Sequence, residues 1–236
     1  MKAQRLRFRY RVTSAAGDLS NRDLVRVWET AVAAAGYALS YSEGRRRLAQ
    51  VALAAPLPLG VTSGGEIADI YLEQPGDPAQ ALKSVAAHLP PGIEALHVSE
   101  MGIDGPSLQS QLRRAEYEVA VPPGLANPEE IKRRIDGLLA ADTLPSEYAR
   151  ATKLKSYDLR PLILGLEVAT TPEATIIRMR LRAEQDRTAR ADQVLLALGI
   201  DASAARIHRV RLEVDKVSAA LQAHRRAGEP TGSHLD

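Results

Sequence analysis

Arginine is the residue type in this sequence with the greatest capacity for chemistry, because its planar fork of N–H donors recognises phosphate and carboxylate groups. Only six of the 31 basic residues are lysine. If arginine rows lie on uncovered sheet faces, they suit contacts with the phosphate backbone of RNA or with another anion. The residues predicted to bind an anion are, in the strand-like stretch "RLRFRYRV", Arg5, Arg7, Arg9 and Arg11; in the turn "EGRRRL", Arg45, Arg46 and Arg47; and in "ATIIRMRLRAE", Arg178, Arg180 and Arg182.

Glutamates near the later arginines offer a competing explanation. Cross-strand pairs between arginine and glutamate stabilise a sheet and keep it soluble without any ligand. The formal net charge of +2 gives little support to a polyanionic partner. Arg209 and Arg211 form a further row on the last strand, and the available partners are Glu116, Glu118, Glu184 and Glu213.

Signals for catalysis are weak in this chain. It contains no cysteine, which excludes disulfides, thiolate zinc sites and an iron–sulfur cluster held by this chain. Its five histidines have no metal-ligand spacing. We predict no metal, no cofactor and no catalytic residue, although the sequence leaves enzymatic activity open.

The stretch "KLKSYDLRPLI" (residues 153–163) is the most site-like segment of the second half. Lys153, Lys155, Asp158 and Arg160 lie within a few extended residues before a proline. They fit an anion pocket, but a salt bridge between Asp158 and Arg160 that stabilises the strand is the favoured interpretation.

The order of elements in the first half is predicted to be β-α-β-β-α-β. Residues 5–12 alternate apolar and basic residues, as a half-buried strand does. Apolar residues at helical spacing follow over residues 21–35, and Asp77-Pro78 opens a second helix. Residues 48–60 and 66–74 are expected to be strands joined by the glycine-rich turn "VTSGGE", and residues 93–101 form the closing strand.

The second half repeats this order with weak sequence identity, which predicts two tandem ferredoxin-like domains with antiparallel sheets in the α+β class. The Gly/Pro/Ser-rich link "GIDGPSLQS" separates them. The predicted domains are residues 1–104 and 110–215, followed by a flexible tail, 216–236. The two helices of each domain cover one sheet face and leave the other free.

No apolar run approaches the length needed to cross a bilayer. The start of the chain lacks the apolar core of a signal peptide. A cytoplasmic location is therefore expected.

Several stretches together resemble the radical SAM-linked domain family, whose members occur alone or fused to radical SAM proteins. The resemblance covers about residues 4–214. Its most specific parts are "YSEG" followed by "PLPLGV", the spacing E-x-x-D at Glu66 and Asp69, and "YDLRP". The positions that match the family pattern are Ser20, Asp23, Ser42, Glu43, Glu66, Asp69, Lys155, Asp158 and Arg160.

Two histidine-containing segments of the family differ here. The first segment is serine–histidine–leucine–aspartate in the family and Ser20, Asn21, Arg22, Asp23 in this chain. The second histidine-containing segment is replaced here by the stretch around Arg45–Leu48. Any role of those histidines in metal binding or acid–base chemistry is therefore lost in this chain.

The resemblance implies a non-catalytic accessory module that binds a radical SAM enzyme encoded nearby, an anionic substrate such as RNA, or both. The alternative is a stand-alone RNA-binding protein that uses the arginine rows. An RNA-processing endonuclease ranks last, because the glycine-rich loop typical of such enzymes is absent near the end of the second half.

Overall fold

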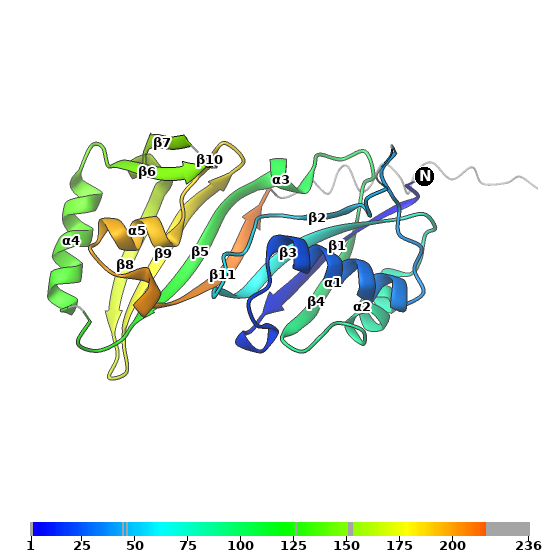
Figure 1. Ribbon diagram of the computed structural model, residues 1–236, viewed down its shortest axis with the longest axis horizontal. Helices are drawn as coiled ribbons and strands as arrows, with labels where there is room; N and C mark the ends of the chain where they lie inside the picture. Colours follow the sequence, from blue (N-terminus) through cyan, green and yellow to red (C-terminus); the bar gives the residue numbers. More distant parts are fainter. Residues whose placement is uncertain (1, 44, 46, 126, 151–152, 216–236) are drawn as a thin grey trace, which may run out of the picture.

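A computed structural model describes residues 2–43, 45, 47–125, 127–150 and 153–215 of the protein, without the side chains of residues 148–155. The fold is mixed α+β, with one large and mostly antiparallel sheet and few helices (Figure 1). The predicted flexible tail, residues 216–236, lies outside the described part of the chain.

The first half contains the expected elements. Helix α1 begins at a capping box, in which the Ser20 hydroxyl accepts a hydrogen bond from the Asp23 amide and the Asp23 carboxylate accepts one from the Ser20 amide. Asp77 caps α2 by accepting a hydrogen bond from the Gln80 amide at 2.7 Å. In chain order the elements are β1 (Gln4–Val12), the 3-10 turn η1 (Ser14–Ala16), α1 (Asn21–Ala34), β2 (Val51–Leu53), β3 (Thr62–Leu72), α2 (Pro78–Ala86) and β4 (Ile93–Met101).

The only tryptophan and the only phenylalanine of the chain lie in the core of this half. Trp28 on α1 is fully buried, and its ring centroid lies 5.1 Å from those of Phe8 and Tyr10 on β1. Burial of large apolar side chains contributes roughly 1.5–3 kcal/mol each. The apolar face of β1 therefore binds α1 to the sheet, as the alternation of residues 5–12 predicts.

The second half has its own core, covered on one side by α4 and α5. Ile131 and Ile135 of α4 and Val194 of α5 pack there with the inward residues of β5 and β9. A hairpin, β6–β7, forms a separate two-stranded sheet. The elements are α3 (Leu108–Gln111), β5 (Leu112–Val121), α4 (Pro128–Ala140), β6 (Pro145–Arg150), β7 (Lys153–Asp158), η2 (Arg160–Leu162), β8 (Ile163–Thr170), β9 (Thr175–Glu184), β10 (Arg187–Thr188), α5 (Ala191–Ala197), η3 (Ala202–Ala204) and β11 (Arg206–Val214).

The two halves share one nine-stranded sheet, which corrects the expectation of a sheet for each half. Its order is β10-β9-β5-β11-β3-β1-β4, with β2 paired to β3 and β8 paired to β9. At the junction β11 runs parallel to β3 and pairs through His208 with Thr62 and Arg209 with Ser63. The sheet is therefore continuous from one core to the other (Figure 1).

The stretch "VTSGGE" is not a hairpin turn, because Thr62–Glu66 already belong to β3. Its glycines permit a close approach of β11. A Cβ added at Gly65 would lie 3.0 Å from the Cβ of Arg211, and one at Gly64 would lie 3.1 Å from the carbonyl oxygen of Val210. Glycine is common in turns, which explains the turn expected from the sequence, whereas in the structure these glycines make room for a neighbouring strand.

Among the described residues, the helices are all too short or too polar to span a membrane.

Candidate functional site

Asp69 on β3 holds two buried arginines of β1. Its carboxylate accepts hydrogen bonds from Arg5 Nε and Nη2 at 2.8 and 2.5 Å and from Arg7 Nε at 2.7 Å. The exposed fractions are 0% for Asp69, 1% for Arg5 and 5% for Arg7. Arg5 also donates to the backbone carbonyls of Gly102, Gly105 and Pro106, and Arg7 to the Gln111 side chain.

The prediction that the arginine row of β1 faces an uncovered surface is therefore wrong for Arg5 and Arg7. Residues 102–111, expected to be only a link, lie over this end of the sheet and enclose both guanidinium groups. Arg9 and Arg11 remain exposed, and Arg11 forms an exposed ion pair with Glu94.

Glu66, the other acid of the E-x-x-D spacing, joins the two halves of the molecule. It forms a two-point ion pair with Arg209 of β11, at 2.6 and 2.5 Å, and accepts a hydrogen bond from the Ser63 hydroxyl at 2.6 Å. Burial alone would lower the pKa of Arg209, but the interactions with Glu66 and with Tyr117 together more than offset this effect and the pKa is raised. Arg209 was expected on an open face and instead is 2% exposed.

The remaining family-pattern residues stabilise loops and helix ends. Ser20 and Asp23 form the capping box of α1, and the Ser42 hydroxyl accepts a hydrogen bond from the Leu48 amide at 3.1 Å. Glu43 is exposed. These positions do not converge on one site.

Asp158 and Arg160 also stabilise the backbone, but not through the salt bridge that was favoured. Asp158 accepts hydrogen bonds from the backbone amides of Leu144 and Arg160 at 2.7 and 3.0 Å. The Arg160 guanidinium donates to the carbonyls of Leu139 and Ile163. The side chain of Lys155 lies outside the described part of the structure.

Arg45 and Arg47 are exposed in the loop before β2. The guanidinium of Arg47 lies over the ring of Tyr41, 5.4 Å from its centroid, a cation–π contact. Arg46 lies outside the described residues.

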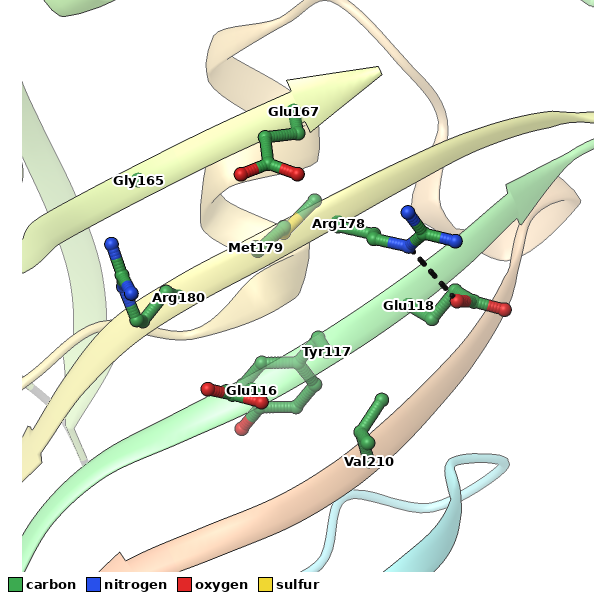
Figure 2. A pocket seen from close by; sticks show the side chains of 9 residues that line it. All are labelled: Glu116, Tyr117, Glu118, Gly165, Glu167, Arg178, Met179, Arg180 and Val210. Carbon is green, nitrogen blue, oxygen red and sulfur yellow. Dashed lines mark hydrogen bonds and ion pairs between the residues drawn. The ribbon is translucent and has the colours of Figure 1, made fainter. Parts of the chain in front are cut away.

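The face of β8, β9, β5 and β11 that points away from α4 and α5 is the best candidate for a binding site. It contains a hollow of about 290 Å³. Figure 2 shows the charged side chains of three strands around it, with the α5 helix behind the sheet. The hollow is lined by Glu116, Tyr117, Glu118, Gly165, Glu167, Arg178, Met179, Arg180 and Val210.

Ion pairs neutralise much of this face. This agrees with the competing explanation from the sequence, in which arginines and glutamates pair across neighbouring strands. The arginine–glutamate pairs are Arg178–Glu118 at 3.4 Å, Arg211–Glu116 at 2.9 Å, Arg211–Glu213 at 3.2 Å, Arg114–Glu213 at 3.3 Å and Arg182–Glu184 at 2.7 Å. Arg180 and Arg206, in contrast, have neither an ion pair nor a hydrogen-bonded side-chain partner among the described residues. The face is therefore a charge lattice with two free guanidinium groups.

Within the described ranges, there is no cluster of histidine and acidic side chains that could hold a metal ion. His208 lies at the edge of the charged face, where its Nδ1 is 2.8 Å from the Thr62 hydroxyl. A second hollow, of about 530 Å³, lies between β7, β10 and the end of β9 and contains Arg182, Arg187 and Arg190. Arg190 is bound by Asp192, whose hydrogen bond raises the pKa of the guanidinium. What this geometry supports is recognition of a charged ligand.

A family model matches residues 5–191, which is most of the chain. Its description is an uncharacterized protein conserved in bacteria (DUF2344). The chain belongs to this family. The family description states no activity or partner, so the expected partnership with a radical SAM enzyme stays a prediction.

No curated protein matches this chain. Solved structures similar to it include a Cbf5–Nop10–Gar1 complex, with 12% identity over 89% of this chain and a TM-score of 0.42. Another is the archaeal box H/ACA sRNP Nop10–Cbf5 complex, with 10% identity over 86% of this chain and a TM-score of 0.38. A third is a RAMP protein binding different RNA substrates, with 7% identity over 88% of this chain and a TM-score of 0.24. The chain spans about half the length of the first two, at 48% and 46%, and the whole of the third. At these TM-scores the likeness carries no argument about the function of this chain.

Proposed function

We propose that the protein binds single-stranded RNA on the uncovered face of β8, β9, β5 and β11. The observation that supports this proposal is the pair of free guanidinium groups, Arg180 and Arg206, on a sheet face that no helix of the second half covers. Free arginines contact phosphates without first breaking an ion pair. The charged lattice around them limits binding to a short stretch of backbone.

Each half of the chain is proposed to be a ferredoxin-like domain, residues 1–104 and 110–215. The strand order supports this division, because β4-β1-β3-β2 in the first half and β11-β5-β9-β8 in the second place equivalent strands in the same order. In such a domain the face without helices is free to bind a ligand.

The salt dependence of binding tests the proposed function. Each phosphate contacted in single-stranded RNA contributes a slope of about −0.7 to the plot of log affinity against log salt. Two free arginines therefore predict a slope of about −1.4, measured by fluorescence anisotropy with a labelled uridine decamer. A broad basic surface would give a much steeper slope.

The double variant Arg180→Ala/Arg206→Ala is expected to lose most of this binding and its salt dependence. A matched control, Arg22→Ala/Arg26→Ala, removes two exposed arginines of α1 and should bind as the native chain does. Equal binding by both double variants would overturn the proposal. Cleavage of the decamer would point instead to the endonuclease alternative.

A further inference from the structure

The charges on the uncovered face follow a regular register that is interrupted at one position. Antiparallel pairing aligns Glu167, Arg178 and Glu118 in a row across β8, β9 and β5. The neighbouring row contains Gly165, Arg180 and Glu116. Glycine therefore stands where the first row has a glutamate, and the hollow lies at this interruption (Figure 2).

The interruption leaves one acid and one base without partners. Arg178 is bound to Glu118, and Glu116 is bound to Arg211 of β11. The carboxylate of Glu167 and the guanidinium of Arg180 consequently have no ion pair or hydrogen bond among the described residues, although both line the hollow. They are diagonal neighbours on adjacent strands, with residue positions roughly 7 Å apart, and no ion pair or hydrogen bond joins their side chains in the described part of the structure.

The space beside Arg180 is open because Gly165 has no side chain. A Cβ at this position would already contact Arg180 Nη2 at 3.5 Å, so a larger side chain would fill the hollow. A hollow of about 290 Å³ is at the lower end of the size of small-ligand pockets and suits one nucleotide rather than an extended ligand.

An unpaired carboxylate can only accept hydrogen bonds, through two adjacent oxygens. The base that matches it presents two adjacent donors on one edge. Guanine does so, with N1–H and the N2 amino group on its Watson–Crick edge, whereas adenine, cytosine and uracil each present only one donor group on that edge. Single-stranded RNA exposes these edges to protein side chains.

We propose that the hollow is a guanine-selecting subsite, in which Glu167 accepts hydrogen bonds from N1–H and N2–H and Arg180 binds the phosphate of the same nucleotide. This inference rests on the proposed RNA binding and adds a preference for one base. Gly165 provides the room for the base between the two side chains.

Labelled uridine decamers that carry one central guanosine, inosine or adenosine test the subsite by fluorescence anisotropy. Inosine differs from guanosine only in lacking the N2 amino group, so it removes one of the two proposed hydrogen bonds. The dissociation constant for the inosine decamer should be about tenfold higher than that for the guanosine decamer, since a hydrogen bond to a charged group is strong. The adenosine decamer should bind no better than inosine.

Two variants assign the effect to the residues. Glu167→Gln should bring the guanosine-to-inosine ratio close to one, because the amide replaces one acceptor with a donor. Glu173→Gln, which removes the same charge from the exposed loop between β8 and β9, should retain the full ratio. Arg180→Ala should weaken all three decamers alike and leave the ratio unchanged.

The outcomes separate the two proposals. Salt-dependent binding of all decamers with equal affinity for guanosine and inosine would overturn the guanine subsite and leave RNA binding intact. Binding of none of the decamers would overturn both. A preference for guanosine that persists in Glu167→Gln would place the selection elsewhere and reject this assignment.

Discussion

The arginines of β1 and those of β9 occupy the same kind of position, on alternate residues of a sheet strand, yet they lie in opposite environments. Arg5 and Arg7 are enclosed with Asp69 beneath residues 102–111. Arg178 and Arg180 lie on a face without helices, among exposed glutamates. An arginine row in a sequence thus does not distinguish a structural ion pair from a ligand-binding surface.

The difference between the two regions is one of solvation. A guanidinium removed from water requires a partner, and removal of that partner leaves a costly buried charge. An exposed ion pair exchanges readily with water and contributes little to stability. Buried pairs should therefore control the free energy of unfolding, and the exposed lattice should control binding.

Asp69→Asn is expected to have the largest effect on stability. The variant leaves two buried guanidinium groups without a carboxylate, which should lower the free energy of unfolding by about 5 kcal/mol, as measured by urea denaturation. The triple variant Arg5→Leu/Arg7→Leu/Asp69→Leu, which removes all three charges, should recover most of this loss. A cost below about 1 kcal/mol for Asp69→Asn would show that the cluster is already well solvated.

Glu66→Gln should lower the free energy of unfolding by about 3 kcal/mol. It should also weaken the coupling between the halves, because the ion pair of Glu66 and Arg209 bridges β3 and β11. Trp28, the only tryptophan, reports on the first core alone. We expect its fluorescence and the far-UV circular dichroism to give coincident transitions in the native chain and separate ones in the variant. Coincident transitions in both proteins would contradict a bridging role.

Gly65→Ala tests the close approach of β11 to β3 at the junction. The added Cβ would lie 3.0 Å from both the Arg211 Cβ and the Val210 carbonyl oxygen, so overpacking should cost about 1–3 kcal/mol in urea denaturation. Gly137→Ala is the matched control, since nothing lies within 4 Å of its added Cβ and alanine favours the α4 helix. Equal stability of the two variants would refute tight packing at this junction.

Ser20→Ala should destabilise the protein by about 1 kcal/mol through loss of the α1 cap. Hydrogen bonds from Ser20 lower the pKa of Asp23 below its usual value of 3.8. This contribution to stability is complete above pH 3.8 and is lost as the pH falls through the lower folded pKa. The variant should therefore lose less stability than the native chain on acidification, and parallel acid-denaturation curves would argue against the linkage.

Arg178→Ala is expected to have the smallest effect on stability. The free energy of unfolding should fall by about 0.5 kcal/mol or less, because the ion pair of Arg178 with Glu118 is exposed. A thermal melt at low and at high salt should show little difference between variant and native chain. A loss of stability comparable to that of Glu66→Gln would contradict the view that buried ion pairs contribute more to stability than exposed ones.

Local patterns predicted most of the elements. Asp77 marks a helix start that the structure confirms, the helical spacing over residues 21–35 matches α1, and the alternation of residues 5–12 correctly places its apolar side chains in the core. These signals are local because a helix cap or an alternating strand depends on residues a few positions apart.

The errors fall where distant segments meet. The enclosure of Arg5 depends on backbone carbonyls some hundred positions away. The role of Gly64 and Gly65 likewise depends on the close approach of β11, a strand far along the sequence. The sequence correctly predicted Arg178, Arg180, Arg182 and Arg211 together with glutamates that pair on the charged face, but it did not predict Glu167 or Arg206 there. The free state of Arg180 was not, because it depends on the register that places Gly165 beside it.

By itself, the sequence determined the α+β class, the order of the elements and the two apolar cores, since periodicity and caps depend on neighbouring residues. Only the tertiary structure decided that the halves share one sheet, that Glu66 and Asp69 neutralise buried arginines, and which arginines remain free. The physical reason is that burial and ion pairing depend on which strand or loop lies next to a side chain, and the pairing of β11 with β3 brings together residues more than a hundred positions apart.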